Sequence, residues 1–310
     1  MKAAWNRFWF RSVPARRIAL LRIAVGLYLL QLQLSEHRAW LRVSRAGQDT
    51  FEGIGLASLL SGPLDDGLWG AVLVSSIVLN VAFVLGIAHR VIAPLFAILL
   101  TFVLGYRNSW GQVYHVNHLA CLHATILALA PAAHAFSVDA WVRKRLGERR
   151  WIDVLAWPRI EAASDWRFGW GVQLMCVVTT IVYSLAGLAK VTGEAGWRWA
   201  LGSNLRDQIA YDALYKELLH PDGGGEWVWR IYAYPDLLIP AAVVTLILEL
   251  LAPVALLHRR LAWLFCISMW LAHLGIDVLM TILFPYQIFG VAYLSFFAIE
   301  RPIDWVLRRR

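Results

Sequence analysis

The fold is decided by residues 68–107, which read LWGAVLVSSIVLNVAFVLGIAHRVIAPLFAILLTFVLGYR. Two apolar runs stand here on either side of a short basic turn, His89-Arg90. A helix needs about 20 apolar residues to cross the hydrocarbon core of a bilayer, and somewhat fewer when flanking groups reach the interface. The segment therefore predicts a hairpin of two transmembrane helices.

The same pattern recurs along most of the chain. Of its 310 residues, 59% are hydrophobic and 16% are charged, whereas soluble domains are about half apolar and a quarter charged. We therefore expect an all-α, polytopic transmembrane helical bundle of about eight spans. The predicted spans are residues 17–35, 68–88, 91–107, 116–134, 169–190, 237–257, 261–283 and 285–300. Because Pro285 separates the last two, they are alternatively one kinked helix followed by a shorter one.

Composition also excludes several classes of protein. The formal net charge of +8 would suit a nucleic-acid binder, but the basic residues stand in short clusters between apolar runs. A soluble enzyme and a nucleic-acid partner are therefore excluded. All three cysteines, Cys121, Cys176 and Cys266, lie within apolar runs, which argues against a disulfide framework. The first apolar run follows basic residues and lacks a small-residue cleavage site, so we expect an uncleaved anchor.

Loop charge predicts the orientation of the chain. With eight spans, the basic N-terminal segment, the loop 135–168 and the cluster Arg308–Arg310 share one side, which predicts cytoplasmic N- and C-termini. The cytoplasmic loop 135–168 is interpreted as an amphipathic interfacial helix held by anionic lipid. The external loop 191–236 is either a lid over a site that opens outward or a surface connection with aromatic anchors. We treat residues 1–310 as a single domain.

Charged residues inside the predicted spans each need a partner, because insertion of a charge into a bilayer is costly. There are four of them, Arg22, Lys190, Glu249 and Asp277. For Arg22 and Glu249 we favour pairing within the bundle, although Arg22 could also reach the cytoplasmic interface. Lys190 ends the fifth span, where it either complements the helix dipole or acts as a base whose amine is shielded from water.

Histidines form a second group of candidate site residues. His115 and His118 share one helix face, but a metal centre needs three or four ligands, so we expect no metal. His273 and Asp277 are four residues apart, a spacing that suits either an oriented acid–base pair or a plain buried hydrogen bond. By loop charge, Lys190, His118 and Asp277 all lie in the external half of the bilayer, as a pocket opening outward would require.

Several motifs occur together over about residues 15–300. They are Arg22-Ile-Ala-Val-Gly26, Ser109-Trp110, Asn117-His118, Ser137-Val138-Asp139, Tyr183, Ala186-Gly187, Lys190, Trp199, Gly202, His273 and Phe284-Pro285-Tyr286. In this order and spacing, the chain resembles the vitamin K-dependent gamma-carboxylase family, including its bacterial relatives that carry the horizontally transferred transmembrane (HTTM) domain.

The resemblance implies a chemistry and a set of roles. Members of the family oxidise reduced vitamin K, a menaquinol-type isoprenoid quinol, with O2 to an epoxide, and CO2 then adds to a glutamate. By resemblance, Lys190 would be the base that deprotonates the quinol and His118 its partner, with Asn117, Tyr183, His273 and Asp277 in support. The partners would be the lipid bilayer, the quinol and a peptide or small-molecule substrate. The location would be a bacterial inner membrane.

The chain also departs from the family. Animal members have a lysine where Ala189 stands, and they continue into a large lumenal domain that we do not expect here. The leading hypothesis is a quinol epoxidase or carboxylase-type lyase that acts at the external side of the membrane. The alternative is a non-catalytic membrane scaffold or assembly factor that keeps the fold. A transporter is disfavoured because inverted repeats are not evident.

Overall fold

The computed structural model describes residues 2–45, 48–111, 113–147, 149–219, 226–280 and 282–307. The chain is about 78% helical, so the predicted all-α class is confirmed. Within the described ranges, strand pairing is limited to β1 (Val13–Pro14), which lies antiparallel to β2 (Ser164–Asp165). The cluster Arg308–Arg310 and residues 220–225 of the predicted external loop lie outside the described residues.

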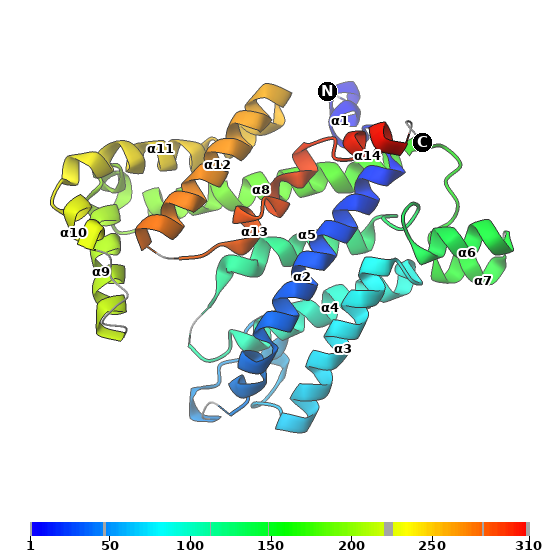
Figure 1. Ribbon diagram of the computed structural model, residues 1–310, viewed down its shortest axis with the longest axis horizontal. Coiled ribbons are helices and arrows are strands. Elements are labelled where there is room, and N and C mark those ends of the chain that lie inside the picture. The colour runs from blue at the N-terminus through cyan, green and yellow to red at the C-terminus, as the bar shows by residue number, and fades with distance from the viewer. Residues whose placement is uncertain are drawn as a thin grey trace. The chain divides into compact units, whose positions relative to one another are not determined.

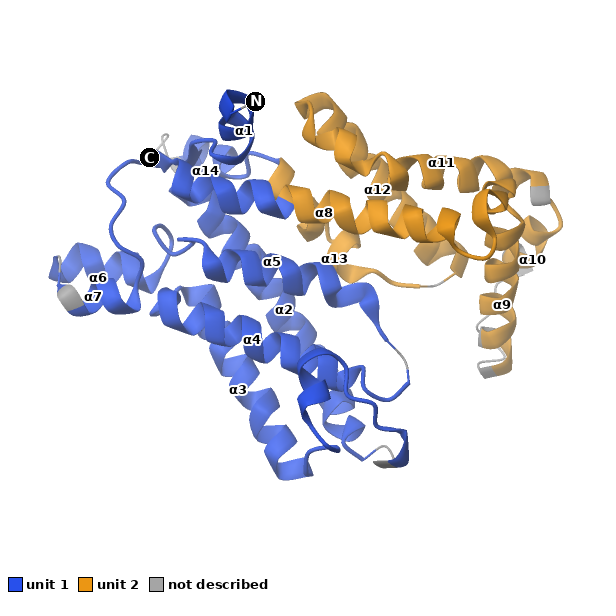
Figure 2. Ribbon diagram, turned by 180° about the vertical axis from the view of Figure 1, so that it is seen from behind, with its two compact units in different colours: residues 1–175, 297–310 blue, residues 176–296 orange. Residues whose placement is uncertain are grey.

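Two compact units make up the chain, as Figure 2 shows. Unit 1 contains residues 1–175 and 297–310, and unit 2 contains residues 176–296. These units are defined only by which residues pack against one another. The expectation that residues 1–310 form a single domain therefore stays a prediction.

Unit 1 is built around four helices that pack side by side, α2 (Ala15–Val43), α3 (Asp66–Leu85), α4 (His89–Arg107) and α5 (His118–Leu129) (Figure 1). Its other elements are α1 (Lys2–Trp9), η1 (Gln48–Thr50), η2 (Gly55–Leu59), η3 (His115–Asn117), α6 (Val138–Leu146), α7 (Arg150–Leu155), the start of α8 (Trp166–Thr192) and α14 (Glu300–Leu307). A Cβ atom on Gly26 of α2 would lie 2.6 Å from the Val84 side chain of α3. Glycine therefore permits the close approach of these two helices.

The predicted hairpin at 68–107 is present as α3 and α4. Asp65 caps the start of α3 by accepting the backbone N–H of Leu68 at 3.0 Å. Gly86 ends that helix in the left-handed region, with φ of 64°. The carboxylate of Asp139, from α6, then accepts the backbone N–H groups of Ala88 at 2.7 Å and His89 at 2.9 Å. These bonds satisfy donors that the first turn of α4 leaves open.

In the part of the chain that the structure describes, unit 2 holds the remainder of α8 and nine further elements. They are η4 (Gly196–Leu201), α9 (Ser203–Leu219), α10 (Glu226–Tyr232), η5 (Pro235–Leu237), α11 (Leu238–Leu250), η6 (Ala252–Leu256), α12 (Arg259–Met280), α13 (Pro285–Ile288) and η7 (Val291–Phe296), together with the loops between them. A cluster of Ile209, Ala213, Val228 and Leu238 joins α9, α10 and α11. A second cluster joins Trp199 of η4 to Ala242 and Leu246 of α11.

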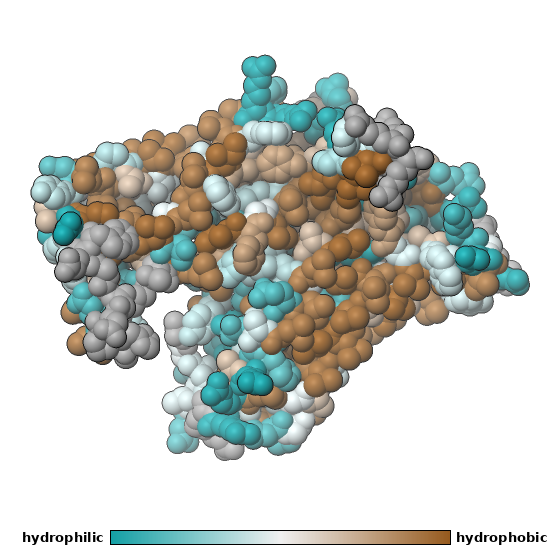
Figure 3. Space-filling view, in the orientation of Figure 1, coloured by the Kyte–Doolittle hydropathy of each residue, from teal (hydrophilic) through white to brown (hydrophobic). Residues whose placement is uncertain are grey.

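Five described helices are long and apolar enough to cross a membrane, namely α2, α3, α4, α8 and α12. Two shorter apolar helices span His115–Leu129 and Leu238–Leu250. On α3, Leu68, Val74, Val78 and Val81 are exposed, and Figure 3 shows hydrophobic residues gathered along this helix. Exposed apolar surface of this extent, on helices of this length, is typical of an integral membrane protein.

Three predicted spans are not continuous helices. The span predicted at 116–134 ends as a helix at Leu129, before Pro131, and that at 237–257 gives way to the 3₁₀ turn η6, which contains Pro253. The span predicted at 285–300 consists of the four-residue helix α13 and the 3₁₀ turn η7, separated by Gly290 at φ of 73°. Proline and left-handed glycine interrupt helical hydrogen bonding at these points. The count of about eight spans and the orientation of the termini stay predictions.

Candidate functional site

The candidate site lies in unit 2, where α8 and α11 touch. Gly187 makes the contact possible, because a Cβ atom there would lie 2.9 Å from the Cβ of Glu249 and 3.0 Å from the backbone nitrogen of Leu250. Ser184, one turn earlier, donates its hydroxyl to the carbonyl of Glu249 at 3.2 Å. Lys190 follows Gly187 by three residues, so it emerges on the same helix face and reaches Glu249.

Lys190 is held between a carboxylate and an aromatic ring. Its Nζ atom lies 2.5 Å from both carboxylate oxygens of Glu249 and 4.6 Å from the centre of the Trp199 ring. The side chain of Glu249 is 9% exposed and that of Lys190 is 25% exposed. The expected pairing of Glu249 within the bundle is therefore confirmed. Lys190 also stands in the last turn of α8, so both interpretations of this residue, a complement to the helix dipole and a shielded base, stay predictions.

Two turns before Lys190, Tyr183 begins a buried chain of polar groups. Its hydroxyl lies 2.8 Å from that of Tyr293, which lies 3.5 Å from Nδ1 of His273. The same Nδ1 atom is 2.7 Å from the carbonyl oxygen of Met269. Because a carbonyl only accepts, this contact places the ring proton on Nδ1 and leaves Nε2 as an acceptor. The ring of Phe284 packs edge-on against His273.

In the described part of α12, Asp277 does not make the contact with His273 that its spacing suggested. It is half-buried on α12, one turn after His273. Within the described residues, the imidazole of His273 bonds to the Met269 carbonyl, and no hydrogen bond joins it to Asp277. His273 is thus oriented by the backbone of its own helix rather than by a carboxylate.

Asn117 and His118 belong to unit 1. Asn117 is buried at the end of η3, and its side-chain oxygen accepts the hydroxyl of Tyr28 at 3.0 Å, which joins this turn to α2. His118 opens α5 and is exposed. Since Lys190 lies in unit 2, a pocket shared by Lys190 and His118 stays a prediction. In the part of the chain that the structure describes, no cluster of three or more His, Cys, Asp or Glu has the arrangement of a metal site.

Arg22 points into unit 1 rather than out to its surface. It is fully buried and donates to the carbonyl oxygens of Ala132 at 2.9 Å, Phe136 at 2.6 Å and Val84 at 3.3 Å. The guanidinium therefore joins α2 to the end of α3 and to the turn that precedes α6.

Sequence reasoning missed one residue of the unit 2 site, Tyr293, and did not identify the partner of another, Glu249. Tyr293 lies in a predicted span and carried no signal, because a single tyrosine there is indistinguishable from an interfacial anchor. Glu249 was recognised as a charge that needed a partner, but the partner was not identified. Testing the four charged residues of the predicted spans as possible ion pairs would have suggested Lys190 as the partner of Glu249.

Comparison with protein-family models, with curated proteins and with solved structures found no match for this chain. The fold and the site define the class of protein as an all-α membrane protein with a lysine–glutamate pair, its carboxylate buried, in the second unit.

Proposed function

We propose that the chain is a membrane enzyme of the gamma-carboxylase type, which oxidises an isoprenoid quinol with O2 at the external side of a bacterial inner membrane. The observation that carries this proposal is the contact of Lys190 with Glu249 beneath the ring of Trp199. The chemistry requires a basic group linked to a proton acceptor, and the Lys190 amine, three-quarters covered by protein, is the candidate for it.

The two side chains can move a proton between them. When the Lys190 ammonium passes its proton to the Glu249 carboxylate, the neutral amine can take the proton of a quinol hydroxyl, which leaves a quinolate and restores the ammonium. In this step Glu249 holds the proton while the amine accepts one from the quinol, and the quinolate that forms then pairs with the ammonium.

Aromatic side chains that could contact a flat substrate occur in unit 2. The Trp199 ring covers Lys190, while Phe265 and Phe284 pack against Tyr183 and His273. Tyr183 lies two turns before Lys190 on α8, and its hydroxyl is bonded to that of Tyr293 in η7. Small-molecule sites typically combine such apolar walls with a few polar groups that fix orientation. When bound, the reduced quinone supplies the electrons that reduce O2. If carboxylation follows, CO2 and a peptide or small-molecule glutamate are the further substrates.

The test is to incubate the purified protein with vitamin K hydroquinone and O2 and to measure epoxide by chromatography. The matched control is Lys190→Arg, because arginine keeps the charge opposite Glu249 but does not release a proton in proteins. We expect turnover by the unmodified protein and loss of at least 100-fold, on the order expected for an acid–base group, in Lys190→Arg. Absence of epoxide with the unmodified protein, or equal turnover by this variant, would contradict the proposal.

A second candidate function is a non-catalytic scaffold or assembly factor. It is favoured by the fact that Nζ of Lys190 contacts both oxygens of Glu249, as expected of a pair that joins two helices. The double variant Lys190→Leu with Glu249→Leu separates the two functions, since it removes the charges together and keeps an apolar contact. A scaffold would retain its cellular function in this variant, whereas the enzyme would lose it.

A further inference from the structure

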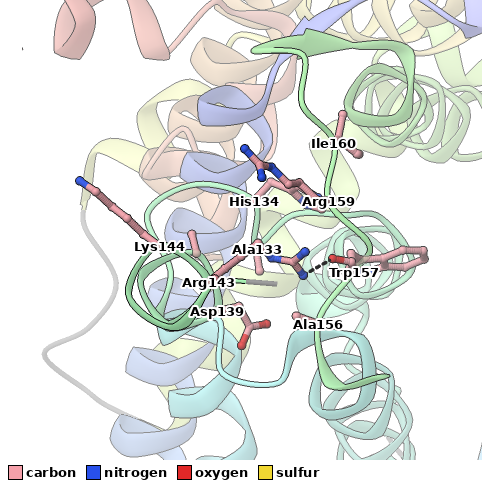
Figure 4. A pocket seen from close by; sticks show the side chains of 11 residues that line it. Ala133, His134, Asp139, Arg143, Lys144, Ala156, Trp157, Arg159 and Ile160 are labelled. Carbon is pink, nitrogen blue, oxygen red and sulfur yellow. Dashed lines mark hydrogen bonds between the residues drawn. The ribbon is translucent and has the colours of Figure 1, made fainter. Parts of the chain in front are cut away.

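Unit 1 contains a pocket of about 510 Å³ that the reaction proposed above does not use. Figure 4 shows it between α6 and the returning segment 156–160. Its lining residues include His134, Asp139, Arg143, Lys144, Trp157 and Arg159. All of them belong to the predicted cytoplasmic loop or to the turn just before it.

The frame of this pocket is fixed by hydrogen bonds. Arg143 donates to the carboxylate of Asp153 at 3.0 Å and to the carbonyl of Trp157 at 2.8 Å, which fastens α6 to the return segment. His134 contacts the carbonyl oxygen of Pro158 at 2.9 Å and that of Pro131 at 3.2 Å. A pocket held in this way loses little conformational freedom when a ligand enters.

Positive charge dominates the lining. Arg143, Lys144 and Arg159 are permanent cations, and Asp139 is the one acid among the described lining residues. The two carboxylate oxygens of Asp139 already accept the N–H groups of Ala88 and His89. Both Lys144 and Arg159 are exposed at the mouth of this pocket.

The imidazole of His134 also favours a negatively charged ligand in this pocket. Both of its ring nitrogens lie within hydrogen-bonding distance of carbonyl oxygens, which only accept, so both bonds form together only when the ring is protonated. Burial opposes that state and lowers the pKa of His134 below its usual value. A negative charge in the pocket would relieve this conflict.

The opposite face of α6 is apolar. Val138 and Trp141 line a separate groove of about 410 Å³ together with Ile23, Leu85 and Phe136. Trp141 is 59% exposed, as is typical of a residue at the membrane interface. An α6 that lies in the interface with this face toward lipid presents its basic face at the depth of phospholipid phosphates.

We propose that the pocket between α6 and residues 156–160 binds a phosphate group, with Lys144 and Arg159 as its ligands. Guanidinium and ammonium groups form charge-assisted hydrogen bonds with phosphate oxygens, and the planar guanidinium can form two at once. A phospholipid headgroup and free inorganic phosphate present the same chemistry to this site. The proposal is independent of any reaction at Lys190.

The test uses the purified full chain in two arms. Inorganic phosphate is titrated by calorimetry in neutral detergent, and phosphatidylglycerol retained from mixed nanodiscs with phosphatidylcholine is counted by native mass spectrometry. The variants are Lys144→Glu and Arg159→Glu, and the matched control is Arg145→Glu. Arg145 is the next residue on the same exposed helix but does not line the pocket.

We expect Lys144→Glu and Arg159→Glu each to weaken binding about tenfold or more, as loss of a charge-assisted bond implies, with little effect of Arg145→Glu. An effect in both arms supports a general phosphate site. An effect on phosphatidylglycerol alone identifies the source as the lipid headgroup, and an effect on inorganic phosphate alone identifies a soluble anion. Equal weakening by Arg145→Glu, or no binding in either arm, overturns the proposal.

Discussion

Arg22 in unit 1 and Lys190 in unit 2 are both cations placed within apolar helices, and the chain satisfies them in different ways. Arg22 is fully buried and donates to three backbone carbonyls, whereas Lys190 contacts one carboxylate. Carbonyls cannot take a proton, and a guanidinium does not give one up. The Arg22 arrangement therefore only holds helices together, while the Lys190 arrangement can also exchange a proton.

The largest expected effect comes from removing the guanidinium. Arg22→Met should destabilise the protein by about 3–5 kcal/mol, because buried carbonyls lose their donors and an apolar side chain replaces them. The measurement is thermal unfolding in detergent. Arg38→Met is a suitable control, since Arg38 is exposed on the same helix and its loss should change stability little. A stable Arg22→Met protein would show that the carbonyls find other partners.

A double-mutant cycle at the Lys190–Glu249 pair should show a smaller but strongly coupled effect. Glu249→Leu alone leaves the Lys190 cation without its carboxylate and should cost about 3 kcal/mol, at the low end for buried pairs because Lys190 is partly exposed. Lys190→Leu together with Glu249→Leu should recover most of that loss. Unfolding of all four proteins measures the coupling. Additive losses would mean that the two side chains do not form a pair.

The contact between α8 and α11 depends on the absence of a side chain at Gly187. Gly187→Ala inserts a Cβ atom 2.9 Å from that of Glu249 and 3.0 Å from the nitrogen of Leu250, so α11 must shift and about 1–3 kcal/mol should be lost. Gly275→Ala on α12 is the matched control, because nothing lies within 4 Å of its added Cβ. The control should be neutral or stabilise the helix by about 1 kcal/mol or less. Equal effects of the two variants would show that α8 and α11 are not tightly packed.

Much of the architecture could be predicted from sequence because long apolar runs leave few alternatives. The hairpin at 68–107 is present as predicted, since each run is long enough to be a helix and the turn between them is short. The limits of the shorter helices could not be predicted equally well. At Pro131 and Pro253, hydropathy continues while the backbone cannot remain helical, and hydropathy alone does not register that conflict.

The candidate site was predictable as a set of residue types but not as a set of contacts. Lys190, Tyr183 and His273 were identified, and in unit 2 a chain of hydroxyls joins Tyr183 to His273 through Tyr293. Which carboxylate meets Lys190 depends on how α8 packs on α11, which no spacing within one helix encodes. The same limit applies to Asp277, whose position one turn from His273 suggested a bond that the described residues do not form.

The smallest expected effect is a pH dependence of stability that comes from Glu300 and Asp139, two carboxyls of unit 1 that lie outside the five long apolar helices. Glu300 accepts two hydrogen bonds from Arg17, at 2.8 and 2.7 Å. Burial opposes its charge, but the Arg17 bonds prevail and hold the pKa of Glu300 below its usual 4.5. Burial instead raises the pKa of Asp139 above its usual 3.8, although backbone N–H groups and Arg22 act in the other direction.

The signs of the two contributions are therefore opposite. The lowered pKa of Glu300 stabilises the folded protein above pH 4.5, and this stability is lost as the pH falls through the lower, folded-state value. The raised pKa of Asp139 means that the folded protein gains stability as the pH falls toward 3.8. Glu300→Gln should reduce the loss of stability below pH 4.5, and Asp139→Asn should remove the opposing gain. The measurement is the unfolding temperature of both variants and of the unmodified protein between pH 3 and pH 6. If the three proteins show the same dependence of unfolding temperature on pH, these two carboxyls do not cause the effect.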